Sequence, residues 1–117
     1  MSIKKDYPLL YLDEEKEEKK LEKRYQKALI AAKKAADLLK KEYDAKEVWL
    51  FGSLAKKERF NKYSDIDLAV RGVAPQKFYS AVGAVTALIR EFKVDLIDLE
   101  DCKKSLAKAV KKDGVKL

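Results

Sequence analysis

Two carboxylates near the middle of the chain have a spacing that suits metal chemistry. The stretch 64–70, SDIDLAV, alternates polar and apolar residues as a half-buried strand does, and residues two apart in a strand share one face. We therefore expect Asp65 and Asp67 to lie side by side. Neighbouring carboxylates repel each other unless a cation neutralises them, and their oxygen atoms suit Mg²⁺ or Mn²⁺. The pair alone does not establish a metal site, because the solvent face of an edge strand has the same pattern.

A Gly-Ser pair precedes these carboxylates and suits phosphate binding. Gly52 and Ser53 end an apolar run, 48–51, that predicts a buried strand. Glycine lets backbone N–H groups approach a phosphate closely, and serine adds a hydroxyl donor. A short helix predicted over 53–59 would direct its positive end to the same place. Four basic residues are expected around it: Lys56, Lys57, Arg59 and Lys62.

A third carboxylate can come from the stretch 93–99, KVDLIDL, which is typical of another strand. Asp95 and Asp98 are three residues apart, so they face opposite sides of the sheet. At most one of them can therefore join the other two carboxylates.

Together these elements resemble a known pattern. Gly52-Ser53, eleven residues, and then Asp65-x-Asp67 with its leading Ser64 resemble the signature of the DNA polymerase β-like nucleotidyltransferase superfamily, specifically its minimal nucleotidyltransferases. The resemblance covers residues 45–117, and by position in the family pattern it implies that Asp95 is the third carboxylate. The chain departs from the family at positions 56–57, where many members have Arg-Gly and this sequence has Lys-Lys.

The resemblance implies an enzyme that moves AMP from ATP to a hydroxyl group. It implies that Asp65, Asp67 and Asp95 are catalytic and hold two Mg²⁺ ions, or Mn²⁺ in their place. It also implies nucleotide binding by Gly52, Ser53 and, on our reading of the pattern, Lys56.

In this family the acceptor is commonly a HEPN ribonuclease toxin, which the nucleotidyltransferase neutralises as its antitoxin. Such a toxin is therefore the expected protein partner. Two alternatives stay open. One is a non-catalytic antitoxin or interaction module with a vestigial site, which the apolar segment 7–12 and the apolar tail 115–117 favour. The other is a transferase acting on a small molecule such as an aminoglycoside.

Helices must hold these strands in place. A long N-terminal helix is predicted over 13–43, a second helix after Pro75 with an apolar stripe that reaches Phe92, and a third over 101–112. The expected fold is α/β (α+β), a nucleotidyltransferase fold with helices packed on a small mixed sheet. We expect one domain over 1–117, with the N-terminal segment and long helix over 1–44 and the catalytic core over 45–117.

Composition limits the function classes. The net charge of +7, with 27 Lys and Arg, favours an acidic partner such as a nucleotide or an acidic protein face, and it suggests nucleic acid only weakly. A charged, heat-tolerant surface would explain it equally well. The absence of histidine excludes a histidine base or zinc ligand, and the single cysteine excludes an intramolecular disulfide. With neither a signal-peptide pattern nor an apolar run of membrane-spanning length, we expect a cytoplasmic protein without a membrane partner.

Overall fold

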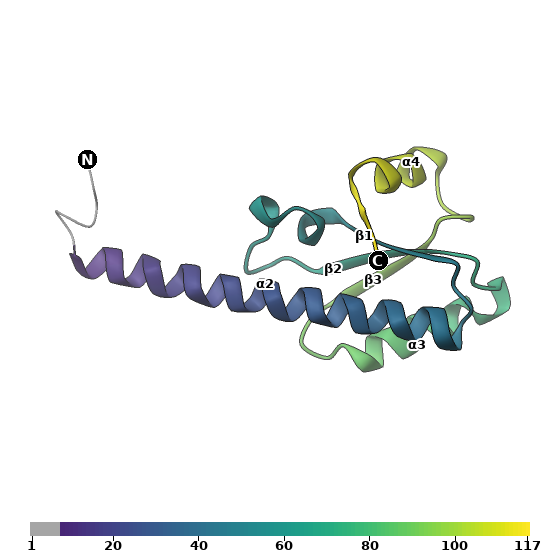
Figure 1. The fold of residues 1–117 in the computed structure, drawn as a ribbon, viewed down its shortest axis with the longest axis horizontal. Coiled ribbons are helices and arrows are strands. Elements are labelled where there is room, and N and C mark those ends of the chain that lie inside the picture. The colour runs from purple at the N-terminus through teal and green to yellow at the C-terminus, as the bar shows by residue number, and fades with distance from the viewer. Residues whose placement is uncertain (1–7) are drawn as a thin grey trace.

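One mixed β-sheet organises the protein, whose computed structural model describes residues 8–117. Its strands are β1 (Glu47–Phe51), β2 (Ile66–Arg71), β3 (Val94–Asp98) and β4 (Val115–Lys116), in the spatial order β3-β2-β1-β4. β1 is antiparallel to β2 and β4, whereas β2 and β3 are parallel. The helix α3 (Pro75–Leu88) forms the crossover between the two parallel strands (Figure 1). The predicted α/β fold with a small mixed sheet is confirmed.

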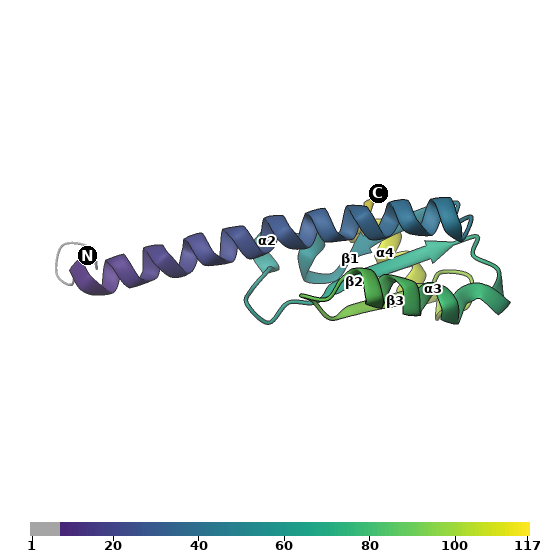
Figure 2. The same cartoon turned by 90° about the horizontal axis from the view of Figure 1, so that it is seen from below.

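The long N-terminal helix, α2, begins earlier than predicted and spans Pro8–Glu42. Proline suits the first turn of a helix because its φ angle is fixed and its missing N–H would have no helical partner. The helix has 35 residues and is therefore about 52 Å long. Its N-terminal part extends beyond the sheet (Figures 1 and 2). The predicted apolar contact segment 7–12 lies partly in this helix, and its first residue falls outside the described residues.

Both α2 and α3 cover the same face of the sheet (Figure 2). Small side chains let α2 approach closely, since five residues of its apolar stripe are buried: Ala28, Ala32, Ala35, Ala36 and Leu39. The predicted stripe of α3 is wrong at its end, because the helix stops at Leu88 and Ile89 has an extended backbone. Ile89 and Phe92 are nevertheless buried, so the loop itself carries these two side chains into the core.

The opposite face of the sheet is covered in part by α4 (Lys104–Asp113). Its Val110 packs with Ala69 and Leu99 in a second, smaller apolar cluster. The apolar tail after α4 is a strand, because Val115 and Lys116 pair with β1 and Leu117 N–H donates to Val48 O at 2.8 Å. No helix within residues 8–117 has the length and apolar character needed to cross a membrane.

Candidate functional site

The sheet register brings two of the predicted carboxylates together. Asp67 on β2 lies opposite Asp95 on β3, and opposite Phe51 on β1. Residues directly opposite each other point to the same face of a sheet, so these three side chains form one row on the α4 face. Asp98 instead lies opposite the buried Val70 and belongs to the other face. The sequence analysis predicted that only one of the two aspartates of β3 could join the row, and the register places Asp95 there.

Asp65 lies just before β2 and not within it, which corrects the predicted strand start. The preceding turn fixes this position: Ser64 N–H donates to Asn61 O at 3.1 Å, and Asn61 N–H donates to Ser64 Oγ at 2.9 Å. Ser64 is buried, and the strand begins at the next core residue, Ile66. Asp65 therefore flanks the row, with its backbone held by the turn on one side and by the sheet on the other.

The end of β1 meets Asp67 directly. Gly52 has φ +72°, a left-handed conformation that favours glycine, and a Cβ at this position would clash with Asp67 Oδ2. Gly52 and the Asp67 carboxylate, separated by the intervening loop in sequence, are thus close neighbours in space. A glycine is required here both by the backbone conformation and by the carboxylate beside it.

The segment after Gly52 is not the α-helix that we predicted over 53–59. It forms two 3-10 turns, Gly52–Ala55 and Lys57–Arg59, with extended backbone at Lys56 between them. Leu54 and Phe60 are both buried. Breaking the helix allows this short segment to place both side chains in the core. Neither turn is long enough to supply the helix N-terminus that we expected to attract phosphate.

Only two of the four predicted basic residues line the hollow beside Gly52, which has a volume of about 150 Å³. They are Lys56 and Arg59, and Lys56 Nζ lies 3.7 Å from Asp113 Oδ1 on α4. Lys57 pairs instead with Glu22 of α2, at 2.9 Å. No sequence signal identified Asp113 or Glu22, because each meets its partner only through the tertiary fold.

Electrostatic repulsion acts on the centre of the row. Burial raises the pKa of Asp67, the negative charges of Asp95 and Asp65 raise it further, and only Lys93 lowers it. Asp65 and Asp95 are therefore both close enough to Asp67 to act on its carboxylate. Such a group of like charges favours proton or cation binding.

The donor set has the chemistry of a hard-cation site, since carboxylate oxygens are the ligands that Mg²⁺ and Mn²⁺ prefer. Asp67 and Asp95 supply such oxygens from adjacent strands on one face. Throughout the described part of the chain, however, no three acidic or thiol side chains already converge as a complete metal cluster. The residues thus fit a divalent cation by type and by face.

Comparison with known proteins assigns the chain to a family. The sequence profile of the polymerase beta nucleotidyltransferase family matches residues 33–117. The chain belongs to this family. Comparison with curated proteins gives no match.

Solved structures that share the nucleotidyltransferase fold include chains of toxin–antitoxin complexes. A chain from a toxin–antitoxin crystal structure with AMP-PNP has 24% identity and a TM-score of 0.61, over 73% of this chain and 70% of that one. A chain from a mutant MntA toxin–antitoxin complex has 25% identity and a TM-score of 0.59, over 73% and 69%. A chain from the tri-AMPylated Shewanella oneidensis HEPN toxin in complex with its MNT antitoxin has 22% identity and a TM-score of 0.56, over 76% and 70%. The predicted resemblance to minimal nucleotidyltransferases is confirmed.

Proposed function

We propose that this nucleotidyltransferase transfers AMP from ATP to a hydroxyl group of a HEPN ribonuclease toxin, and so acts as its antitoxin. One observation carries the proposal: Asp67 lies opposite Asp95 and against Gly52, so that the glycine expected to approach phosphate and two of the predicted carboxylates meet at one end of the sheet. This juxtaposition occurs in a chain of a nucleotidyltransferase family.

In this proposal Asp65, Asp67 and Asp95 would hold two Mg²⁺ ions, or Mn²⁺ in their place. When bound, the cations would neutralise the carboxylates and polarise the oxygens of the transferred phosphate. Asp95 accepts the proton of the attacking hydroxyl. Gly52 supplies close backbone approach for the terminal phosphates, and Ser53 supplies a hydroxyl donor.

Lys56 and Arg59 provide positive charge at the hollow beside Gly52. Lys56 pairs with Asp113, which also lines this hollow, so its ammonium group lies beside the proposed phosphate site. Lysine contacts phosphate as a point charge and not as a bidentate fork. We therefore assign Lys56 to charge neutralisation of the polyphosphate and not to its precise orientation.

The structural neighbours support the choice of nucleotide and acceptor. One of them was crystallised with AMP-PNP, an ATP analogue. Another contains a HEPN toxin that carries three AMP groups, together with an MNT antitoxin. We extend these findings to this chain by proposing a HEPN toxin as its acceptor.

Transfer of label from radioactive ATP tests the catalytic part of the proposal. The wild-type protein should label an acceptor protein in the presence of Mg²⁺, and Asp65→Asn and Asp67→Asn should abolish the labelling. Asp98→Asn is the matched control, because Asp98 belongs to the other face of the sheet. Labelling by both Asn variants at the wild-type rate would disprove the assignment.

A second candidate function is neutralisation by binding alone. It is favoured by the incomplete convergence of carboxylates among residues 8–117 and by the Lys-Lys sequence at positions 56–57. In that case Asp65→Asn and Asp67→Asn would still protect cells from the toxin. The enzymatic proposal requires that both variants bind the toxin and fail to protect.

A further inference from the structure

One turn of α2 contacts all three loops that carry the candidate site. The turn comprises Glu22, Arg24 and Tyr25, which lie before the part of the chain that the family profile matches, residues 33–117. The loops are 52–60, which follows β1, 61–65, which precedes β2, and 89–93, which precedes β3. The contacts with these loops are made by side chains and differ in kind.

Arg24 joins two of the loops. Its Nη2 donates a hydrogen bond to Ser64 O at 3.1 Å, directly before Asp65. Its guanidinium also lies over the ring of Phe92, 4.6 Å from the ring centroid, in the loop that leads to Asp95. Arg24 Nε is buried and has no hydrogen-bond partner within residues 8–117. An unsatisfied buried N–H costs free energy, so packing alone does not account for an arginine at this position.

A backbone hydrogen bond joins the same two loops beneath Arg24. Ile66 N–H donates to Lys93 O at 3.0 Å, at the point where β2 and β3 both begin. Arg24 contacts Ser64, two residues before Ile66, and Phe92, the residue directly before Lys93. Arg24 therefore contacts the chain just before Asp65 and β2, and just before the strand β3 that carries Asp95.

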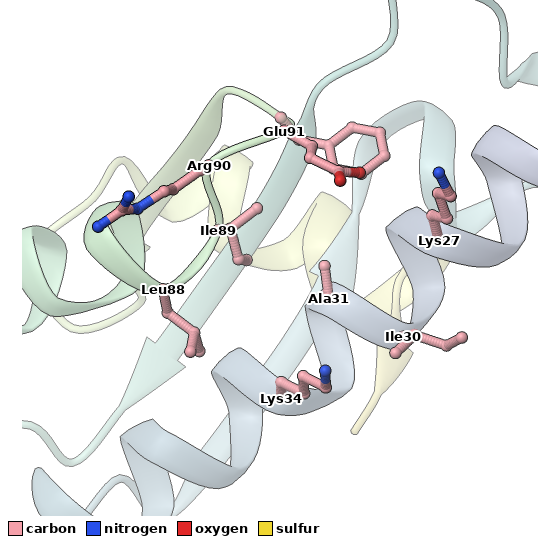
Figure 3. A pocket seen from close by; sticks show the side chains of 9 residues that line it. Lys27, Ile30, Ala31, Lys34, Leu88, Ile89, Arg90 and Glu91 are labelled. Atoms are coloured by element: carbon pink, nitrogen blue, oxygen red, sulfur yellow. The ribbon is translucent and has the colours of Figure 1, made fainter.

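Two surface hollows lie where α2 meets these loops. A hollow of about 390 Å³ separates α2 from the 89–93 loop, with Ala31 on the helix facing Ile89 on the loop (Figure 3). A second hollow, of about 410 Å³, lies between α2 and the 61–65 loop and is bordered by Arg24 itself. The Arg24 contacts lie at the border of the second hollow and add to the core packing of Ile89 and Phe92 against α2.

Glu22 and Tyr25 hold the third loop. Glu22 Oε2 lies 2.9 Å from Lys57 Nζ, and the same ammonium lies 5.4 Å from the centroid of the Tyr25 ring. Tyr25 also packs edge to face on the buried Phe60, with ring centroids 5.4 Å apart. The Glu22–Lys57 pair is exposed and contributes little stability, so its effect is to orient the loop after Ser53.

We propose that the Glu22–Tyr25 turn of α2 is a positioning element for the transferase site, and that Arg24 is its central positioning residue. The effect of this turn on catalysis rests on the proposed function. Its effect on the position of the strand ends does not depend on that function. Arg24 touches neither the nucleotide site nor the carboxylates. It sets the relative position of the two strand ends from which Asp65 and Asp95 flank Asp67.

Amide hydrogen exchange of the metal-free protein tests the structural part. In Arg24→Ala the Ile66 amide should exchange about 10-fold faster than in the wild type, while the amide of Leu50 in β1 should be unchanged, because only the junction loosens. Arg24→Lys should restore part of the protection, since lysine keeps the charge over Phe92 but lacks the planar guanidinium. Lys23→Ala, at an exposed position of the same turn, is the control and should behave as the wild type.

AMP transfer by the same variants tests the catalytic consequence. Small misplacement of reacting groups can cost on the order of 100-fold in rate, so Arg24→Ala should lose about that factor while Lys23→Ala loses none. If Arg24→Ala does not fold, Phe92→Leu and Arg24→Lys decide the question, and both should show faster Ile66 exchange. Unchanged exchange and transfer in the folded Arg24 variants would overturn the inference. A wild-type protein that transfers no AMP would refute the proposed function and the catalytic role, while the exchange measurement would still decide the positioning role.

Discussion

Burial and repulsion between carboxylates both act on Asp67. It is half-buried, it lies between two other carboxylates, and its side chain occupies the space beside Gly52. Burial raises the pKa of Asp67, and the charges of Asp95 and Asp65 raise it further, so its ionised form is less favourable in the folded protein than in the unfolded chain. A site with this property is stabilised by anything that supplies positive charge.

The first prediction concerns Asp67→Asn in metal-free buffer. A raised folded-state pKa gives a contribution to stability that is complete below the ordinary value of 3.8 and is lost as the pH rises through the folded-state pKa. Asparagine cannot ionise, so the variant should be more stable than the wild type at neutral pH, and its advantage should disappear in acid. Urea unfolding across this pH range measures the difference. An Asp67→Asn variant that is less stable than the wild type at neutral pH would refute the repulsion argument.

The second prediction concerns Gly52→Ala. A side chain at φ +72° is strained, and its Cβ would meet the Asp67 carboxylate, so the variant should lose about 1–3 kcal/mol of unfolding free energy and most of its transferase activity. Gly83→Ala is the matched control, because Gly83 lies in α3 with open space around it and should gain about 0.5–1 kcal/mol. Denaturant unfolding of both variants measures this, and equal effects would contradict the close-approach explanation.

The spacing of the aspartates predicted which carboxylates could share a face of the sheet. It did not predict which turns and contacts fix the position of each residue. The alternation around Asp67 and the three-residue interval between Asp95 and Asp98 are local properties of strands, and the register agrees with both. Asp65 was predicted within the strand but lies before it, because the turn at Ser64 determines its backbone position. Lys57 was expected near the phosphate site but pairs with Glu22. This partner is distant in sequence, and no local pattern signals such a contact.

Among the elements, α2 packs on the sheet through small side chains. Ala32 and Ala35 have no exposed surface where the helix crosses the sheet, and small side chains there set the distance between the two layers. Helix α2 also supplies the turn that contacts the three site loops. A change in the distance between α2 and the sheet would therefore displace the site loops as well as disturb the packing of the core.

The third prediction follows from this close packing. Ala32→Leu should destabilise the protein by about 1–3 kcal/mol, because the added carbons have no space at the interface with the sheet. Lys33→Leu, one residue along on the exposed side, should change stability by no more than about 0.5 kcal/mol. Thermal or urea unfolding separates the two cases. An Ala32→Leu variant as stable as the wild type would show that the helix can move away from the sheet.

Periodicity predicted the existence of the helices better than their ends. The predicted range 13–43 contains the buried stretch of α2 from Ala28 to Leu39, whereas the helix starts earlier, at Pro8. The α3 stripe continued in sequence beyond the helix, because a loop can also bury apolar residues such as Phe92. The short β4 was missed because two residues pair with β1 only after α4 has returned the chain to the sheet.

At the scale of the whole molecule, metal binding should appear as a gain in global stability. If Mn²⁺ binds only the folded protein, a concentration of about 100 times its dissociation constant should add about 2.7 kcal/mol to the unfolding free energy. A chelator should remove this gain. Asp98→Asn should keep it and Asp67→Asn should lose it, and an equal gain in the two variants would place the metal elsewhere.

The candidate site, the helix that supports it and the projecting N-terminal part of this helix follow one another along the molecule. The sheet carries the candidate site at one end, α2 supports that end from behind, and the N-terminal part of α2 extends beyond both (Figures 1 and 2). The net charge of +7 predicted an acidic ligand but did not distinguish a nucleotide from a protein surface. Family membership and the geometry of the site together favour the nucleotide.

Intact-mass spectrometry of the two proteins together tests the central claim most directly. The purified protein would be mixed with ATP, Mg²⁺ and the protein encoded beside it on the chromosome, and both masses would be measured against a parallel reaction with Asp67→Asn. We predict that the neighbour gains one or more AMP units in the wild-type reaction and none in the variant reaction. A neighbour that binds the wild-type protein yet keeps its original mass, or one that gains AMP equally with Asp67→Asn, would contradict the account.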